Sequence, residues 1–293
     1  MVERISFYDQ ISRNKRNSIL LFGIVGAVLI ALIYSISRAF STLDSFIILI
    51  FAIIFTTIYS LVSYYSSDSI ALLSVGAIKA NQTQYRQYYS IVEGLTLASG
   101  IPMPQLYIMN NPQINAFATG RDPKHAVICV TTGALEKLNK QELEGVLAHE
   151  MSHIANYDIR FMTLTAILVG MISIVAQIFL RSLWFRGDRD SNNKSGTIFL
   201  VIGIVLAILA PIVTSLVQLA ISRKREYTAD ATAVKFTRSP TGLINALSKI
   251  KSNSEMKVSG SISPLFIAKP NKAAELFSTH PALEKRIEIL KKM

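Results

Sequence analysis

The sequence predicts a mainly α-helical integral membrane protein with four transmembrane helices and a small α+β domain that contains a small antiparallel sheet. Hydrophobic residues make up 51% of the 293 residues. The mean hydropathy is +0.39, which disfavours a soluble globule. Long charge-free segments recur along the chain, and the polar stretches between them show helical or strand-like periodicity.

Four predominantly apolar segments lack charged residues over lengths that can cross about 30 Å of hydrocarbon, which needs about 20 helical residues. They are Ser18–Ser37, Ser45–Ser67, Phe161–Leu180 and Ser195–Ser222. The fourth segment is longer than a span requires and contains Pro211. We therefore expect it to kink, or to continue as a helix beyond the bilayer.

The spans divide the chain into four parts. Residues 1–67 hold an N-terminal cytoplasmic segment and a transmembrane hairpin, and residues 161–222 hold the second transmembrane pair. The polar residues 68–160 and 223–293 are expected to form the two parts of one domain. They contain short strand-like runs and helical patterns but no long uninterrupted apolar run.

Basic residues near the span ends predict the orientation in the membrane. Four of them precede the first span, whereas only Arg38 lies in the turn after it; the four are Arg4, Arg13, Lys15 and Arg16. We therefore expect a multi-pass protein of the inner membrane with both termini and both polar parts on the cytoplasmic side. The loop 181–194 also holds four basic residues although this topology places it outside. The sequence therefore leaves open whether the third and fourth spans cross completely.

The charge balance indicates a lipid partner and argues against nucleic acid. The formal net charge is +11, from 30 Lys and Arg against 19 Asp and Glu. The basic residues lie between hydrophobic runs, which favours contact with the anionic inner leaflet of a bilayer. Cys129 is the only cysteine, so an intrachain disulfide and a metal site with two cysteines are excluded.

The first polar part predicts a helix, a small sheet and a second helix. Apolar residues recur at helical spacing over Gln84–Gly100, before Pro102. Three short β-rich runs follow, separated by Asn-Pro and Asp-Pro; they read QLYIMN, INAFATG and HAVICVTT. After Thr132, helical spacing returns and continues as far as Asp158.

The stretch VLAHEMSHIANYD, residues 146–158, contains the candidate metal-binding and catalytic residues. On a helix, His149 and His153 project from the same face one turn apart and can bind one metal ion. Glu150 lies about 100° round the helix from His149, where it can reach a metal-bound water without being a ligand. This HExxH spacing indicates hydrolysis with zinc as the cofactor, although a surface pair of histidines would show the same letters.

A hydrolytic zinc site needs a third protein ligand and one open position. Past the fourth span, SRKREYTADATAVKF places Glu226 and Asp230 four residues apart on another predicted helix. Glu226 can complete a His₂Glu site, and Asp230 can accept a hydrogen bond from the distal nitrogen of a zinc-bound imidazole. The alternative is that Glu226 forms a solvated ion pair with Arg223 or Arg225.

Four motifs in this order resemble the HtpX-type membrane zinc endopeptidases, a group of gluzincins related to the CAAX prenyl proteases. They are PQLYIMNNPQINAFATG, VLAHEMSHIANYD, SRKREYTADATAV and STHPALEKR. The resemblance covers nearly the whole chain. It implies a gluzincin-like fold, one Zn²⁺ held by His149, His153 and Glu226, and Glu150 as general base and later proton donor.

The resemblance also implies further site residues. Asn115 and Ala116 would lie on an edge strand that holds an extended substrate, although Asn115 could instead be a turn residue after Pro112. His280 and Arg286 would lie near the oxyanion or the substrate, and Pro281 suits the first position of a helix. The alternative is that His280 caps the helix and that Arg286 pairs with a nearby glutamate. Asp158 also matches the pattern, either orienting a ligand or capping the helix.

These observations lead to the hypothesis of a membrane-bound zinc endopeptidase that hydrolyses peptide bonds of membrane proteins, membrane-associated proteins or unfolded polypeptides at the cytoplasmic face. The resemblance adds a role in protein quality control and the stress response. A non-catalytic zinc-binding membrane scaffold is the main alternative, but it would need the metal and not Glu150. A CAAX-type processing protease is a weaker one, since it would need more spans. A metal transporter is disfavoured because the spans contain no His, Asp or Glu.

Overall fold

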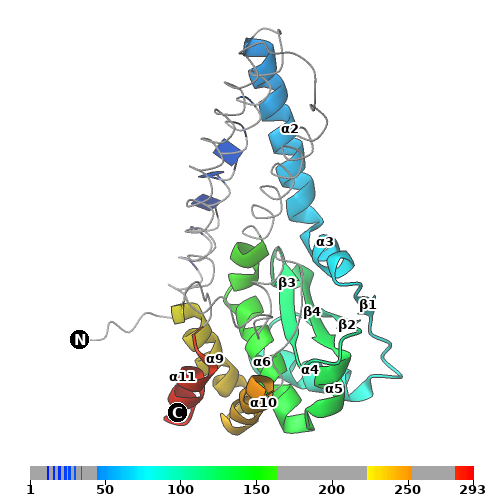
Figure 1. Ribbon diagram of the computed structural model, residues 1–293, viewed down its shortest axis with the longest axis vertical. Coiled ribbons are helices and arrows are strands. Elements are labelled where there is room, and N and C mark those ends of the chain that lie inside the picture. Colours follow the sequence, from blue (N-terminus) through cyan, green and yellow to red (C-terminus); the bar gives the residue numbers. More distant parts are fainter. Residues whose placement is uncertain are drawn as a thin grey trace, which may run out of the picture.

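The computed structural model describes residues 45–163, 223–252 and 281–293, together with isolated positions between residues 12 and 34. The predicted spans Ser18–Ser37 and Ser195–Ser222 and nearly all of Phe161–Leu180 lie outside the described residues. The described part is mainly helical and contains one four-stranded sheet, as Figure 1 shows.

The sheet has the strand order β1-β2-β4-β3 and is mixed, so the prediction of an antiparallel sheet was wrong. Its strands are β1 (Ile78–Lys79), β2 (Gln105–Met109), β3 (Ala116–Gly120) and β4 (Ala126–Thr131). β3 and β4 form an antiparallel hairpin, but β4 lies beside β2 and runs parallel to it, with Tyr107 opposite Cys129. The three β-rich runs indicated where β2, β3 and β4 lie, but β1 was not predicted. The order of the strands depends on tertiary packing that local patterns do not encode.

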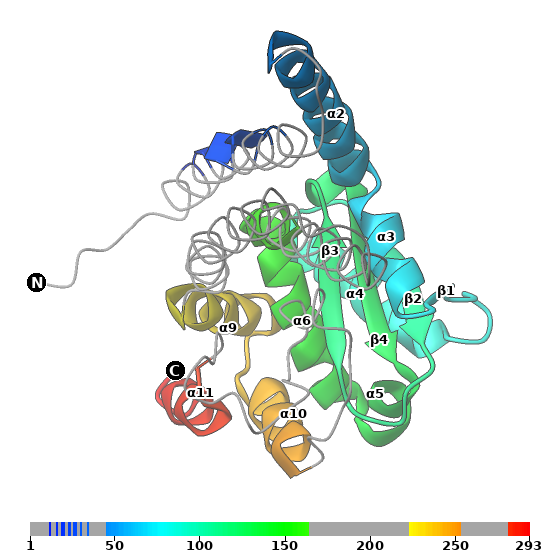
Figure 2. The same ribbon diagram turned by 45° about the horizontal axis from the view of Figure 1, so that its top comes forward.

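Both faces of the sheet are covered, and every residue of β3 and β4 is buried. One face packs into the main core, where Ile128 and Val130 meet the helices α4 (Arg86–Ser99) and α6 (Lys140–Ala155). The other face forms a smaller cluster in which Phe117 and Cys129 pack with Leu72. Figure 2 shows α6 between the sheet and the helices α9 and α10.

The helix boundaries follow from local capping. α4 ends at Gly100, whose φ of 70° is left-handed, the usual glycine C-cap. The single helix expected after Thr132 is two helices, α5 (Thr132–Lys137) and α6. The break falls where Asn139 starts α6 with a capping box: its side chain accepts from the Glu142 N–H, while the Glu142 carboxylate accepts from the Asn139 N–H.

The second polar part contributes three helices. They are α9 (Arg223–Thr237), α10 (Thr241–Ser252) and α11 (Leu283–Leu290). α9 and α10 pack against α6, and α11 packs on α9 and α10. α6 and α10 approach so closely that a Cβ on Gly145 would collide with the Leu243 backbone. Residues on either side of the 164–222 stretch therefore pack against one another, with α9 beside the HExxH helix.

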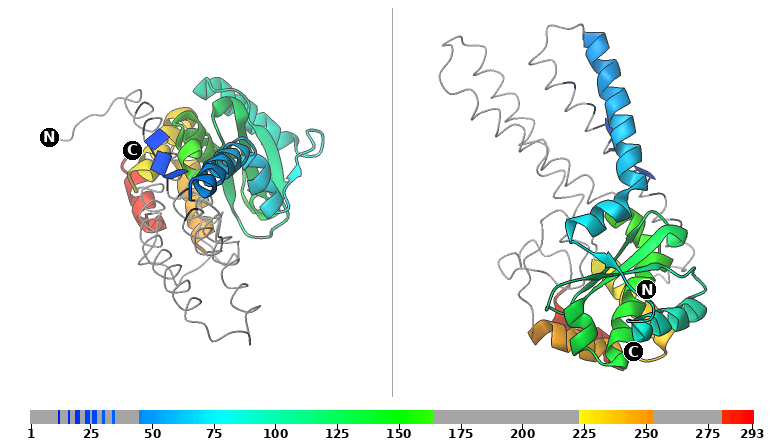
Figure 3. Two further views of the ribbon diagram at one scale, coloured as in Figure 1. Left: turned by 90° about the horizontal axis from the view of Figure 1, so that it is seen from above. Right: turned by 90° about the vertical axis from the view of Figure 1, so that its right-hand side faces the viewer.

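The helix α2 (Ser45–Tyr65) rises from this domain as an apolar rod, most clearly in the right view of Figure 3. A second helix, α3 (Ser67–Ser74), follows at an angle and returns to the sheet. Within the described ranges, no single helix meets the length and hydropathy requirements of a span. Leu49–Tyr65 and α3 meet them together, with 69° between their axes. The four spans therefore stay a prediction.

Candidate metal and catalytic site

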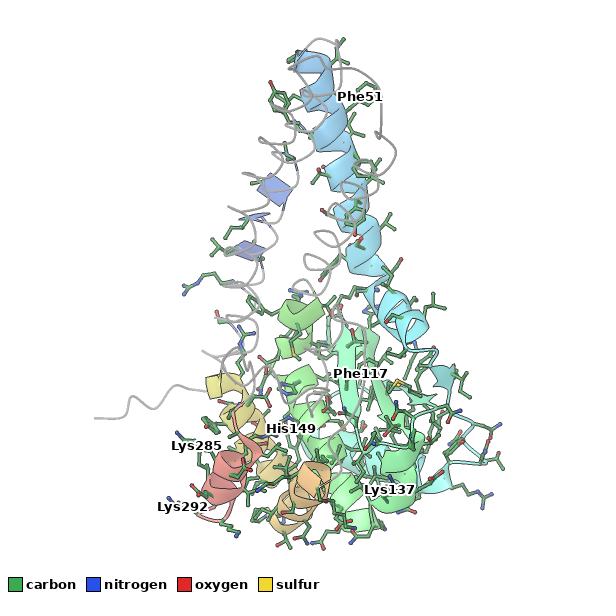
Figure 4. The ribbon with its side chains drawn as sticks, viewed as in Figure 1. Phe51, Phe117, Lys137, His149, Lys285 and Lys292 are labelled. Atoms are coloured by element: carbon green, nitrogen blue, oxygen red, sulfur yellow. The ribbon has the colours of Figure 1, made fainter. Side chains whose placement is uncertain are left out.

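The two histidines of HExxH lie on the buried face of α6, where their rings meet edge to face. The Nε2 atoms of His149 and His153 are 3.3 Å apart, and both side chains are almost fully buried. Figure 4 shows His149 between α6 and α9, far from Phe51 on α2. Helix periodicity explains why the His149 and His153 rings meet, because residues i and i+4 share a face.

Glu226 on α9 brings a carboxylate to both imidazoles. Its Oε2 lies 3.6 Å from His149 Nε2, and its Oε1 lies 3.6 Å from His153 Nε2. Two ligand atoms of one tetrahedral zinc ion lie about 3.4 Å apart, since each bond is about 2.0–2.1 Å. The side chains therefore fit a His₂Glu metal site, and all three are buried.

The distal nitrogens of both histidines face carboxylates. Asp230 Oδ1 lies 3.0 Å from His149 Nδ1, and Asp158 Oδ2 lies 3.1 Å from His153 Nδ1. A carboxylate on Nδ1 holds the proton there and leaves the Nε2 lone pair for a metal. Both Nε2 atoms accordingly point at Glu226.

Charges around His149 act in opposite directions on its pKa. Burial and the Arg286 guanidinium lower the pKa, but hydrogen bonds with Asp230 and Glu226 outweigh them and raise it to about 9. The imidazole is thus stabilised as a cation among carboxylates when it holds a proton. A metal ion in the same place would supply the positive charge instead, since a ligating imidazole must be neutral.

Arg286 on α11 lies beside His149 and Glu226 and is completely buried. Its Nε and Nη2 donate to the two carboxylate oxygens of Asp230 at 2.9 and 2.6 Å. Its Nη1 lies 3.4 Å from Glu226 Oε2. The bidentate pair holds Asp230 in place, and the positive charge of the guanidinium also offsets the buried Glu226 carboxylate.

Glu150 is buried beside the sheet, where its carboxylate accepts a hydrogen bond from the Ala118 N–H of β3. Burial raises the pKa of Glu150, while the two HExxH histidines lower it. Asn115 directly precedes β3, and its side-chain oxygen accepts from the Ala116 N–H. β3 is the outer strand on this side, so Asn115 and Ala116 lie along the same strand edge that approaches Glu150.

Comparison with known proteins decides the family. Residues 80–293 match the model of peptidase family M48. The chain belongs to this family. A "Protease HtpX homolog" from Thermoanaerobacter pseudethanolicus is 44% identical over 299 residues, covering all of this chain and 99% of that protein. One from Caldanaerobacter subterraneus is 48% identical over 252 residues, 84% of each chain.

A solved structure supports the fold of this M48 peptidase. The crystal structure of S. mikatae Ste24p has a TM-score of 0.52 and 22% sequence identity. The match covers 92% of this chain and 64% of the Ste24p chain, so this chain spans less than two thirds of that protein. Together with the clustered His149, His153 and Glu226, family membership identifies a metalloprotease.

Two sequence expectations near the C-terminus need comment. His280 lies outside the described residues. Pro281 was expected at the first helical position, which was wrong: α11 begins at Leu283 with Ala282 as its N-cap. The alternative that Arg286 pairs with a neighbouring glutamate on α11 does not hold in the structure, because the guanidinium binds Asp230 on α9.

Asp158 is the site residue that sequence reasoning left unassigned in this M48 peptidase. It follows the end of α6 and is fully buried, with Arg225 Nε 3.8 Å from its second carboxylate oxygen. A signal was present in the sequence, since Asp158 comes five residues after His153 and just beyond the helix end, where the chain can turn back. His125 instead pairs with Asp122 in an exposed turn, away from the metal ligands.

Proposed function

We propose that this M48 metalloprotease is a membrane-bound endopeptidase with one Zn²⁺ per chain, held by His149, His153 and Glu226. The observation that carries the proposal is the meeting of a His₂Glu set, a buried glutamate and the edge of a strand. Substrates are membrane-associated or unfolded polypeptides, cleaved at the cytoplasmic face. The resemblance to HtpX-type proteases adds a role in protein quality control.

The chain's own residues have separable tasks in this reaction. When bound, zinc supplies an acidified water and polarises the scissile carbonyl. Glu150 takes a proton from the attacking water and later delivers it to the leaving amine nitrogen. The Ala118 N–H holds the Glu150 carboxylate against β3 and away from the ligand positions.

The layer behind the ligands positions them. Asp230 and Asp158 keep the two imidazoles turned with Nε2 inward. We assign Arg286 to this layer as a positioning residue, because its guanidinium donates to both carboxylate oxygens of Asp230 and lies 3.4 Å from the Glu226 carboxylate. Stabilisation of the oxyanion, which the resemblance implies, is then assigned to His280. We expect His280→Ala to lower kcat.

The edge of β3 suits an extended substrate. A polypeptide that lies along Asn115 and Ala116 would form main-chain hydrogen bonds with little preference for side chains. Such binding agrees with unfolded substrates, because a folded protein has few free extended segments. The Asn115 side chain, which already turns toward the Ala116 N–H, is the polar group at the start of this edge.

The apolar surface of α2 supports the membrane location. Along this helix three phenylalanines are each 59–68% exposed, namely Phe46, Phe51 and Phe55. Such exposed apolar side chains are more stable in contact with lipid than with water. We propose the division into a hairpin of residues 1–67, a second membrane pair of residues 161–222, and one protease domain made from residues 68–160 and 223–293. The close packing of α6 with α9 and α10 supports the single domain.

Metal analysis combined with casein digestion separates this proposal from its rivals. We expect about one zinc per chain and cleavage that a chelator abolishes and added zinc restores. Bound zinc without chelator-sensitive cleavage would favour the non-catalytic scaffold. Cleavage confined to prenylated C-terminal peptides would favour the CAAX-type processing protease, for which the likeness to Ste24p gives the fold alone.

A further inference from the structure

A hollow lies apart from the proposed metal ligands. It has a volume of about 710 Å³ and lies between the end of α4, the turn joining β3 to β4, the end of α6, and α9. Its lining contains none of His149, Glu150, His153 or Glu226. It is therefore large enough for a small ligand and distinct from the proposed peptidase site.

The charged groups of this hollow favour an anion. Three cationic side chains line it, from Lys124, Arg160 and Lys235. Its one acidic group, Asp122, is already engaged: the carboxylate contacts His125 Nδ1 at 2.8 Å and accepts the N–H groups of Lys124 and His125. The lining thus carries three cationic groups against one acidic group, and an arginine with two lysines is a typical set for phosphate.

The hollow adjoins the ends of two charge-free segments. The Arg121 carbonyl accepts hydrogen bonds from the Tyr64 hydroxyl at 3.5 Å and from Arg160 Nε at 3.0 Å. The Arg121 guanidinium lies 5.2 Å from the centre of the Tyr65 ring. Tyr64 and Tyr65 end α2, and Arg160 immediately precedes the apolar run from Phe161. Tyrosine and arginine at such boundaries are typical of headgroup depth.

Tyr157, which also lines the hollow, has an unusual backbone. Its φ is 60°, just past the C-cap of α6, where glycine is the common residue. A left-handed tyrosine costs about 1 kcal/mol or more. The ring lies 5.9 Å from the Arg160 guanidinium, so the strained position places an aromatic face against one of the three cations.

We propose that this hollow, lined by Lys124, Arg160 and Lys235, binds the phosphate-bearing headgroup of an anionic membrane lipid. The proposal rests on the membrane location given under the proposed function. A lipid is favoured over a soluble phosphate compound because the hollow lies beside the ends of the two apolar segments. It is favoured over an acidic peptide because the hollow shares no residue with the β3 edge.

The test compares two charge-matched double variants of the full chain in detergent. One carries Lys124→Gln and Lys235→Gln, which leaves the Arg160 contact with Arg121 intact. The control carries Lys291→Gln and Lys292→Gln, both exposed beyond the end of α11. Binding of dihexanoyl phosphatidylglycerol, dihexanoyl phosphatidylcholine, glycerol phosphate and a hexaglutamate peptide is measured by native mass spectrometry and by thermal shift.

Wild type and control should bind the phosphatidylglycerol with equal affinity, and the Lys124/Lys235 variant about tenfold or more weakly. The affinity for phosphatidylcholine should be the same for the wild type and both double variants. Equal binding by all three proteins overturns the proposal. Glycerol phosphate that binds as tightly as the lipid also overturns it, because that would indicate a soluble ligand. Binding of the acidic peptide at these lysines without binding of the lipid overturns it as well.

Casein cleavage in detergent separates this result from the peptidase proposal. Both double variants should keep the wild-type, chelator-sensitive rate, because their lysines lie outside the metal site. Normal cleavage with unselective lipid binding overturns only the lipid site. Selective lipid binding without cleavage by wild type overturns only the peptidase.

Discussion

Replacing Asp158 with Asn tests the layer of carboxylates behind the metal ligands. The Asp158 carboxylate lies 3.1 Å from His153 Nδ1 and is fully buried. An amide keeps the shape and one acceptor but loses the negative charge that strengthens the imidazole as a ligand. Losing such a partner typically weakens metal binding 10–100-fold, or about 1.4–2.7 kcal/mol. We expect zinc affinity to fall within this range.

The assay is competition for zinc against a fluorescent chelator, with casein cleavage measured at saturating zinc. Asp122→Asn is a matched control, because Asp122 holds His125 Nδ1 at 2.8 Å in an exposed turn away from the ligands. It should leave zinc affinity unchanged. If Asp158→Asn binds zinc within twofold of wild type while remaining folded, the contact does not orient His153 and the reasoning fails.

Three further predictions concern stability and are measured by thermal or chemical unfolding. Gly145→Ala should lower the free energy of unfolding by about 1–3 kcal/mol, because its Cβ meets the α10 backbone. Gly94→Ala, in open space on α4, should leave it unchanged or raise it by up to about 1 kcal/mol. Equal effects of the two substitutions would contradict the close packing of α6 and α10. Asn139→Ala should cost about 1 kcal/mol through loss of the capping box, and an unchanged midpoint would show that the cap is dispensable. Arg286→Met should cost about 3–5 kcal/mol by leaving Asp230 uncompensated, while a gain in stability would show that the ion pair is not needed.

Local patterns were enough for the individual elements that build the site. Helical spacing placed His149 and His153 on one face, and the motif in α9 supplied Glu226 and Asp230. Histidine and carboxylate side chains are common metal ligands, so their spacing along a helix already restricts how they can be arranged around one ion. The structure adds that α9 lies against α6, with the Glu226 carboxylate 3.6 Å from both imidazoles.

Other features depend on packing between distant segments. The insertion of β4 between β2 and β3 changes no local pattern, which explains the wrong prediction of an antiparallel sheet. The break before α6 did have a local signal, an asparagine followed three residues later by Glu142, but continuous apolar periodicity masked it. The pairing of Arg286 with Asp230 joins residues 56 positions apart, and nearer glutamates on α11 were equally plausible from sequence.

The most direct test of the peptidase account is Glu150→Gln in the full chain, with metal content and casein cleavage measured on the same sample. Glutamine keeps the size of the side chain and leaves the three metal ligands in place, so zinc should stay at about one per chain. It removes the base, so cleavage should fall by about 10²–10⁴-fold. Cleavage at the wild-type rate by a zinc-loaded Glu150→Gln protein would contradict the account.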